Sequence, residues 1–252
     1  MPEQAVELER SGVDVILAGP FEALLAPKQS TTRVPIIMTP SVDPVATGVV
    51  KSLDRPGGTI TGITEMMPEL TPRRLQLLKQ IVPTLSRVAI LWSPGTLREE
   101  TLKRTLEETH ATARALGVQI QVVEASKVDD FEAAFSAMAK ERAEGLIVLV
   151  NPIFFVQRQH IIERAAKLRL ATIYEWKPFV QSGGLISYGA DVPDVYRRAA
   201  GLVDKILKGT KPGDLPVEGP KLVDMAVNLK AAKALELTIP GSLIKQAVLV
   251  IE

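Results

Sequence analysis

Residues 35–62, PIIMTPSVDPVATGVVKSLDRPGGTITG, place a strand, a polar turn, a helix and a glycine-rich turn in immediate succession. The first four residues have the short apolar run of a buried strand. Hydroxyl and carboxylate side chains follow at the end where open α/β sheets bind ligands, namely Thr39, Ser41 and Asp43. The Asp-Pro pair suits the start of a helix over residues 45–53, whose free N–H groups can hold an anion such as a carboxylate. The alternative is that Asp43 only caps its own helix.

The composition of the chain favours parallel sheets covered by helices. Apolar residues make up 46% of the 252 residues and aromatic residues only 4%, so the interior rests on Val, Ile, Leu and Ala. Thirty Lys and Arg against 29 Asp and Glu leave a formal charge of +1, with bases and acids interleaved. This distribution argues against a nucleic-acid surface. No run approaches the roughly 20 apolar residues of a membrane span, so we expect a chain that does not cross a membrane.

Strand and helix patterns alternate along almost the whole chain, which is typical of parallel βαβ architecture. We expect strands over residues 13–18, 35–38, 59–64, 87–92, 118–123, 145–150, 171–175 and 184–188. We expect helices over residues 21–29, 45–53, 72–81, 99–116, 129–142, 154–168, 177–181, 194–208 and 229–235. The predicted fold is α/β with two lobes: residues 1–62 and 184–216 form the first, residues 63–183 form the second, and residues 217–252 are shared between them.

Side chains for catalysis and metal binding are sparse. The sequence has no cysteine, which removes thiol nucleophiles and thiolate metal sites. The two histidines, His110 and His160, fall inside long predicted helices, without a carboxylate or a second histidine at metal-ligand spacing. No nucleophile elbow, phosphate-binding lysine motif or His-Glu-x-x-His is present. We therefore expect no enzyme activity, no cofactor and no metal.

Small, polar and aromatic residues recur in the turns after the predicted strands. These turns are residues 19–21, 41–43, 93–96, 151–152, 174–176 and 188–191. In a doubly wound sheet they share the carboxyl edge, and two lobes facing edge to edge would enclose one cleft lined by them. Five aromatic residues lie at or beside these turns: Phe21, Trp92, Tyr174, Trp176 and Tyr188. Such a cleft suits a modest polar ligand with an apolar portion, although each aromatic residue could instead serve core packing.

Five segments resemble the substrate-binding proteins of ABC transporters, in the group that includes aromatic amino acid binders. They are VDVILAGP at 13–20, VPIIMTPSVDPVATGVVKSLDRPGGTITGIT at 34–64, RRLQLLKQIVPTLSRVAILWSP at 73–94, GGLISYGADVPDVYRRAAGLVDKILKGTKPGDLPVE at 183–218 and VNLKAAKALELTIPGSLI at 227–244. The most specific elements are Asp-Pro-V-x-x-G, RPGG-x-x-TG and GG-L-x-SYG. The resemblance implies a two-lobed type I periplasmic-binding fold. Such a protein closes around a small solute in the periplasm and delivers it to the permease subunits of an ABC importer.

The same resemblance implies the ligand class and the ligand-binding residues. The expected ligand is an amino acid or a similar small carboxylate. The implied contacts are Gly19, Pro20, Phe21, Ser41 and Asp43 in the first lobe, Trp92, Ser93, Thr96, Asn151 and Tyr174 in the second, and Tyr188 and Asp191 in the returning segment. Relatives often have threonine where this chain has Pro20, which removes a hydroxyl and an N–H from the site.

The resemblance also bears on the start of the chain. Family members normally precede the strand at 13–18 with a signal peptide, a strand and a helix. We therefore expect this sequence to be truncated at its N-terminus, so that the first lobe lacks its N-terminal strand and the signal sequence lies upstream.

Two other functional classes stay open. The effector-sensing core of a transcription regulator uses the same two-lobed fold, and it would require a DNA-binding module upstream. An enzyme of the two-lobed racemase kind would act at the same cleft. The absence of cysteine argues against the thiol-based versions of such an enzyme.

Overall fold

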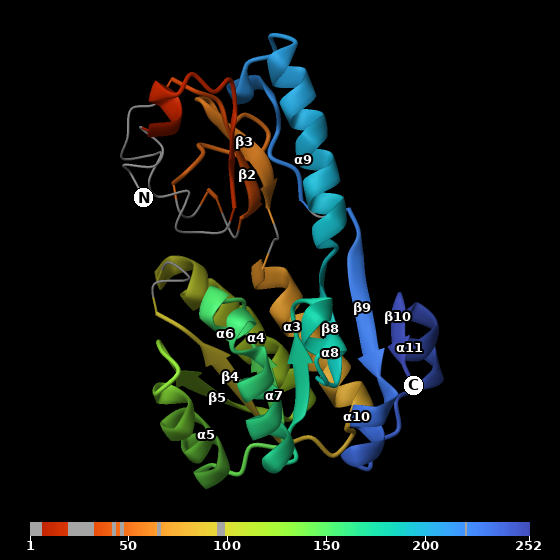
Figure 1. The fold of residues 1–252 in the computed structure, drawn as a ribbon. Coiled ribbons are helices and arrows are strands. Elements are labelled where there is room, and N and C mark those ends of the chain that lie inside the picture. Colours follow the sequence, from red (N-terminus) through yellow and green to blue (C-terminus); the bar gives the residue numbers. More distant parts are fainter. Residues whose placement is uncertain are drawn as a thin grey trace. The chain divides into compact units, whose positions relative to one another are not determined.

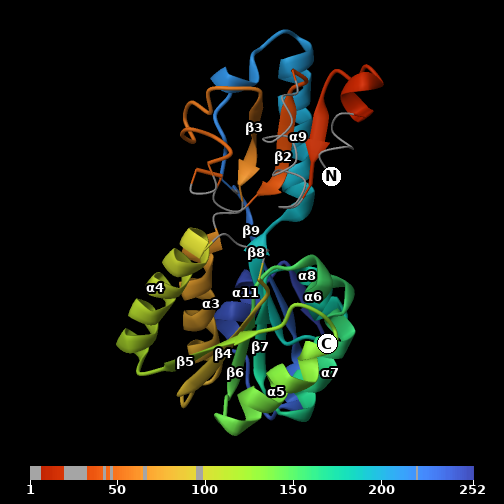
Figure 2. The same ribbon diagram turned by 90° about the vertical axis from the view of Figure 1, so that its left-hand side faces the viewer.

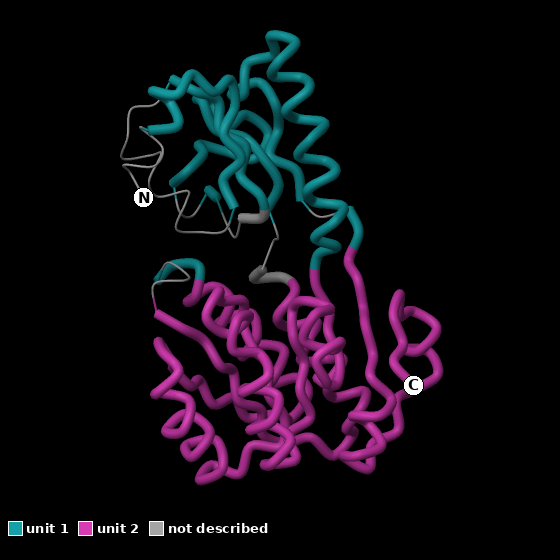
Figure 3. Tube along the Cα trace, in the orientation of Figure 1, with its two compact units in different colours: residues 1–67, 97–101, 190–222 teal, residues 68–96, 102–189, 223–252 magenta. Residues whose placement is uncertain are grey.

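The computed structural model describes residues 7–19, 33–41, 44–45, 48–64, 67–94, 99–219 and 221–252. Its strands form two separate sheets, one of three strands and one of seven. The chain divides into two compact units (Figure 3): unit 1 holds residues 1–67, 97–101 and 190–222, and unit 2 holds residues 68–96, 102–189 and 223–252. The predicted α/β class, with parallel sheets and flanking helices, is confirmed.

Unit 1 is built on a three-stranded parallel sheet in the order β1-β2-β3, with the long helix α9 packed on it (Figure 1). The elements are β1 (Ile16–Ala18), β2 (Ile36–Ser41), β3 (Ile60–Thr64), α9 (Val192–Leu207) and the short 3₁₀ helix η1 (Pro212–Asp214). Successive residues of β2 face opposite sides of the sheet. Ile36 and Met38 pack in one apolar cluster with Ile16, whereas Ile37 packs against Leu202 of α9. The period of two therefore buries both faces of the central strand.

The described residues between 44 and 53 form turns and bends, so the helix predicted over 45–53 is wrong there. The N–H of Gly48 donates to the carbonyl of Val45, and the N–H of Val49 donates to the carbonyl of Pro44. Gly48 has φ 63°, a left-handed conformation that stops helical winding. No helix N-terminus follows the Asp-Pro pair within the described residues, and the predicted anion site loses that support.

Unit 2 contains the seven-stranded sheet, in the order β10-β9-β8-β7-β6-β4-β5. The strands are β4 (Arg87–Trp92), β5 (Gln119–Glu124), β6 (Gly145–Val148), β7 (Ala171–Tyr174), β8 (Ile186–Ala190), β9 (Val223–Asn228) and β10 (Leu249–Ile251). Neighbouring strands run parallel from β5 through β8, and β9 runs parallel to β10. After β4 the chain adds β5 on one side and then β6 on the other. The strand order therefore reverses at β4 and β6, where open α/β sheets form their ligand crevice.

Helices cover both faces of this sheet (Figure 2). They are α3 (Met67–Ile81), α4 (Glu99–Leu116), α5 (Asp130–Lys140), α6 (Pro152–Val156), α7 (Arg158–Lys167), α8 (Lys177–Gln181), α10 (Leu229–Ala234) and α11 (Gly241–Gln246). Helices α3 and α4 lie on one face, and α5 and α7 lie on the other. On the second face, Leu91 of β4 packs in one buried cluster with Phe131 of α5 and Ile161 of α7. Within the described part of the chain, no helix is both long and apolar enough to cross a membrane.

The passage of the chain between the units differs from the predicted boundary at residue 184. Residues 186–190 form β8, and β8 pairs with β7 of unit 2 through Ile173–Ile186 and Tyr174–Ser187. The chain therefore re-enters unit 1 at residue 190, not at residue 184. The strand pairing keeps the Ser-Tyr-Gly element of residues 187–189 in the seven-stranded sheet.

Candidate functional site

The point where the strand order reverses in unit 2 carries three predicted site residues. Trp92 ends β4 and is half-buried, and the buried Ser93 follows it. Asn151 follows β6, the neighbouring strand, and its Oδ1 accepts hydrogen bonds from the N–H groups of Ile153 (2.7 Å) and Phe154 (3.2 Å), which caps α6. The structure thus brings Trp92, Ser93 and Asn151 to adjacent strand ends at the carboxyl edge.

The two predicted tyrosines of unit 2 lie in different surroundings. Tyr188 of β8 is half-buried, and its carbonyl accepts a 2.7 Å hydrogen bond from Nε of Arg74. Tyr174 is fully buried, and its ring stacks on Phe179 with centroids 4.5 Å apart. Burial raises the pKa of the Tyr174 phenol above its ordinary value. Tyr174 is therefore part of the core of unit 2.

A buried ion pair, which the sequence analysis missed, stands at the end of β7. Arg74 of α3 places Nη2 3.2 Å from Oε1 of Glu175, and the two side chains are 0% and 2% exposed. The Nη1 atom of Arg74 also donates to Oγ1 of Thr71 at 3.4 Å. Arg74 lies beside Arg73 in a helix, where the local pattern indicates a solvated face. Only the tertiary packing of α3 against the sheet reveals that Arg74 is buried.

Several polar atoms at the carboxyl end of β7 and in β8 are buried without a hydrogen-bond partner among the described residues. They are Oε2 of Glu175, Nε1 of Trp176 and Oγ of Ser187, whereas Oε1 of Glu175 is paired with Arg74. Ser187 is the register partner of Tyr174, so it lies level with the last residue of β7. Nearly all buried polar groups in native proteins are paired with protein groups or with ordered molecules, so these atoms are available to molecules that are not part of the chain.

Unit 1 has its own polar strand ends. Oδ1 of Asp191 accepts a 3.4 Å hydrogen bond from the N–H of Asp194 and caps α9. Gly19 follows β1, and a Cβ built on it would lie 3.5 Å from the carbonyl oxygen of Thr39 and 3.6 Å from the hydroxyl of Tyr196. Oγ1 of Thr39 is buried and has no hydrogen-bond partner in the described ranges. Tyr196, a residue of α9, was not predicted as a site residue, because an exposed aromatic residue on a helix carries no local signal.

The other predicted site residues lie at a strand end or outside the described residues. Ser41 is the last residue of β2. Pro20, Phe21, Asp43 and Thr96 lie outside the described residues. The described residues also contain no group of three His, Cys, Asp or Glu side chains arranged to hold a metal ion.

The chain was compared with known proteins and solved structures. The profile of the "ABC transporter substrate binding protein" family matches residues 3–251. A tyrosine-binding protein from Clostridioides difficile (strain R20291) is 25% identical over 224 residues, which cover 89% of this chain and 63% of that protein. The alignment thus spans less than two thirds of this relative.

Two solved structures share the fold over 99% of this chain. A conserved domain protein from Vibrio cholerae O1 biovar eltor matches at 25% identity over 84% of its chain, with a TM-score of 0.88. An ABC domain in complex with L-Trp from Streptococcus pneumonia matches at 24% identity over 83% of its chain, with a TM-score of 0.89. With the family profile covering nearly every residue, this chain belongs to the ABC transporter substrate-binding protein family.

Proposed function

We propose that this protein binds an amino acid with an aromatic side chain, and that it serves an ABC importer outside the cytoplasmic membrane as the substrate-binding component. Family membership supports the binding role and does not favour the regulator alternative. The name of the tyrosine-binding relative supports the ligand class. Delivery to permease subunits is proposed from the family alone.

The observation that carries the proposal is the set of buried polar atoms without hydrogen-bond partners just after β7 and within β8. This set contains an acceptor, Oε2 of Glu175, and donors, the indole N–H of Trp176 and the hydroxyl of Ser187. A free amino acid carries an ammonium donor and a carboxylate acceptor on one carbon atom. A zwitterion therefore matches this mixed set better than a neutral sugar or a simple anion does.

Aromatic side chains next to these polar atoms supply contact surface for the apolar part of such a ligand. The ring of Trp176 meets the ring of Phe155 edge to face, with centroids 5.4 Å apart. The guanidinium carbon of Arg158 lies 5.1 Å from the centroid of Phe155 on the ring face, which fixes that ring further. Trp92 adds a half-buried indole at the end of β4. We assign the ligand's side chain to these aromatic surfaces.

The polar strand ends of unit 1 are proposed as a second set of ligand contacts. This set comprises Gly19, Ser41 and Asp191 from the sequence analysis, together with Thr39 and Tyr196 from the structure. The buried hydroxyl of Thr39 can both donate and accept a hydrogen bond, so it suits either end of a zwitterion.

Isothermal titration calorimetry with L-tyrosine, L-tryptophan and L-phenylalanine tests this function, with D-tyrosine and glucose as comparison solutes. We expect saturable binding of at least one L-amino acid and much weaker binding of the comparison solutes. Glu175→Gln is expected to weaken binding at least about tenfold, equivalent to about 1.4 kcal/mol. The matched control is Glu132→Gln, a carboxylate that is 74% exposed and pairs with Arg164.

Two results would count against the proposed function. One is binding of glucose in preference to every amino acid. The other is an unchanged amino acid affinity in Glu175→Gln, provided that circular dichroism shows the variant to be folded.

A further inference from the structure

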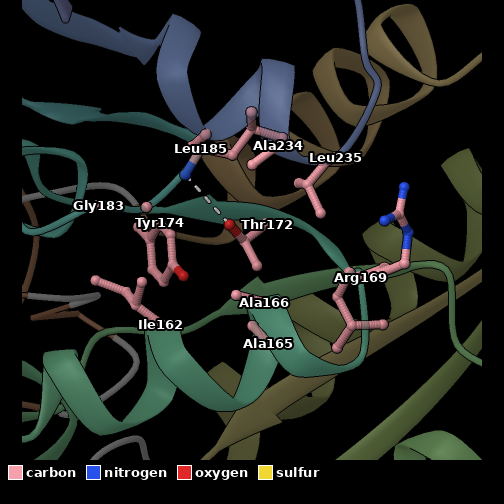
Figure 4. A pocket seen from close by; sticks show the side chains of 13 residues that line it. Ile162, Ala165, Ala166, Arg169, Thr172, Tyr174, Gly183, Leu185, Ala234 and Leu235 are labelled. Carbon is pink, nitrogen blue, oxygen red and sulfur yellow. Dashed lines mark hydrogen bonds between the residues drawn. The ribbon is translucent and has the colours of Figure 1, made fainter.

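A pocket of about 180 Å³ lies inside unit 2 between α7 and α10 (Figure 4). Its walls are mainly aliphatic, with Ile162 and Ala166 from α7, Ala231 from α10, and Leu235 directly after α10. Leu185, just before β8, closes it from the sheet side. The residues that immediately precede β7 and β8 line the pocket, so it opens toward the amino ends of these strands. The ligand crevice discussed above lies at their carboxyl ends.

Two glycines and several alanines create this space. A Cβ built on Gly184 would lie 2.5 Å from Cε2 of Tyr174, so the tyrosine ring occupies the place where a side chain would stand. Gly183 has φ 110°, which a residue with a side chain rarely adopts. Alanines at positions 165 and 166 of α7 and 231 and 234 of α10 then leave a gap between the helices.

The hydroxyl of Tyr174 points into this pocket (Figure 4). Tyr174 is fully buried, and its hydroxyl lies beside that of Thr172: burial raises the pKa of the phenol, and a hydrogen bond with Thr172 partly offsets that rise. The neighbouring hydroxyl of Thr172 already accepts the N–H of Leu185 at 3.3 Å. Burial raises the pKa of Tyr174, so its phenol stays protonated at neutral pH and can donate a hydrogen bond. The phenol O–H can exchange Thr172 for an acceptor on a molecule bound in the pocket.

A cation stands at the rim of the same pocket. Arg169 follows α7, and its Nη2 lies 2.9 Å from Oε1 of Glu236, which follows α10. Both side chains are largely exposed, at 57% and 81%, so this ion pair contributes little to stability. The guanidinium can therefore exchange Glu236 for the carboxylate of a bound molecule at small cost.

The size of the pocket limits the occupant to one ring. An engineered apolar cavity of about 150 Å³ is known to bind benzene, so about 180 Å³ admits a substituted benzene and excludes an indole with its backbone groups. We propose that this pocket is a second ligand site of the protein, which binds a single-ring aromatic carboxylate. The ring lies between α7 and α10, the carboxylate contacts Arg169, and a ring substituent accepts the hydrogen bond of Tyr174.

Nuclear magnetic resonance titration of the ¹⁵N-labelled full chain with 4-hydroxybenzoate tests this site. We expect saturable chemical-shift changes of the backbone amides of Gly183, Leu185 and Ala234. A dissociation constant of about 1 mM is expected for so small a ligand. Ala166→Leu fills the pocket from an exposed helical position and should weaken binding at least about tenfold. Ala234→Leu fills it from the opposite helix and serves if Ala166→Leu does not fold.

Charge recognition is tested separately with 4-methylphenol, which lacks the carboxylate. Arg169→Gln should weaken 4-hydroxybenzoate binding about fivefold and leave 4-methylphenol binding unchanged. The matched controls are Ala200→Leu, at an exposed helical position in α9, and Arg197→Gln, which replaces an exposed arginine that pairs with Asp194. Both controls should bind like the unmodified protein.

Three outcomes would overturn the second site. They are shifts confined to amides outside the pocket, unchanged affinity in both alanine variants, and no saturation up to about 20 mM 4-hydroxybenzoate. None of them bears on amino acid binding at the carboxyl edge, which the calorimetric experiment measures independently.

Discussion

Arg74 and Glu175 form a buried ion pair, with Nη2 of the arginine 3.2 Å from Oε1 of the glutamate. The arginine also donates from Nε to the carbonyl of Tyr188, so one side chain connects α3 with the end of β7 and with β8. Burying two charges is costly, and the cost is balanced only while both partners are present. The polar groups at this edge therefore depend on one another for their positions.

The first prediction concerns the loss of one member of this pair. Arg74→Met should lower the free energy of unfolding by about 3–5 kcal/mol, because it leaves the Glu175 carboxylate buried without a counter-charge. The double variant Arg74→Met/Glu175→Leu should recover part of this loss, since no buried charge remains. Urea unfolding followed by circular dichroism measures both values.

An exposed ion pair provides the control for this prediction. Arg104 and Glu108 of α4 are 50% and 38% exposed, and Arg104→Met should cost at most about 0.5 kcal/mol. Equal losses in Arg74→Met and Arg104→Met would mean that the buried pair has no special structural role.

The second prediction concerns the glycine of the Ser-Tyr-Gly element. A Cβ on Gly189 would lie 2.3 Å from the carbonyl oxygen of Glu175, a contact that only a backbone shift can relieve. Gly189→Ala should therefore lower the free energy of unfolding by about 1–3 kcal/mol. In α9, a Cβ on Gly201 meets no atom within 4 Å, and Gly201→Ala should instead stabilise by up to about 1 kcal/mol. Thermal unfolding measures both variants. If Gly189→Ala proved as stable as Gly201→Ala, the close approach of Glu175 to Gly189 would not restrict this position.

Much of the fold could be predicted from the sequence, because hydrophobic period and helix-stop residues act locally. The predicted strand over residues 87–92 and helices over residues 99–116 and 177–181 match β4, α4 and α8 residue for residue. The helix predicted over 45–53 was wrong in its described residues, since the left-handed Gly48 outweighed the Asp-Pro start signal.

The candidate site was harder to predict than the fold. Strand-end turns located Trp92, Ser93 and Asn151 correctly at the carboxyl edge, because parallel strands bring their ends together. The same reasoning assigned Tyr174 to the ligand, but the tyrosine ring packs on Phe179 over the space left by Gly184. The burial of Arg74 could not be predicted from its local sequence either. Contacts between elements distant in sequence decide both cases.

The third prediction compares two buried threonines of unit 1. Oγ1 of Thr61 donates to the carbonyl of Leu215 at 2.8 Å, whereas Oγ1 of Thr39 has no hydrogen-bond partner among the described residues. Thr61→Val should lower the free energy of unfolding by about 1 kcal/mol, and Thr39→Val should leave it unchanged or raise it. If Thr39 contacts the ligand as proposed, Thr39→Val should still weaken amino acid binding. A destabilised Thr39→Val with normal affinity would contradict the proposed role.

The fourth prediction concerns pH and Glu218, whose N–H and C=O pair along β3 with Gly62 and Thr64. The hydrogen bond from Arg198 lowers the pKa of the Glu218 carboxyl below its ordinary value, and the charges of Arg198 and Lys221 act in the same direction. A carboxyl group whose pKa is lowered in the folded state stabilises the folded protein at pH values above its unfolded pKa. This contribution to stability disappears as the pH falls through the pKa of the folded state. Glu218→Gln should therefore destabilise at about pH 7, and its difference from the unmodified protein should shrink as the pH falls to about 3.

Urea unfolding of Glu218→Gln and the unmodified protein at both pH values tests this dependence. Asp204→Asn is the control, because Asp204 forms an exposed i,i+4 pair with Lys208, with side chains 61% and 73% exposed. Its effect on the free energy of unfolding should stay below about 0.5 kcal/mol at neutral pH. A difference between Glu218→Gln and the unmodified protein that is as large at about pH 3 as at about pH 7 would show that the charge of Glu218 is not what stabilises the edge of β3.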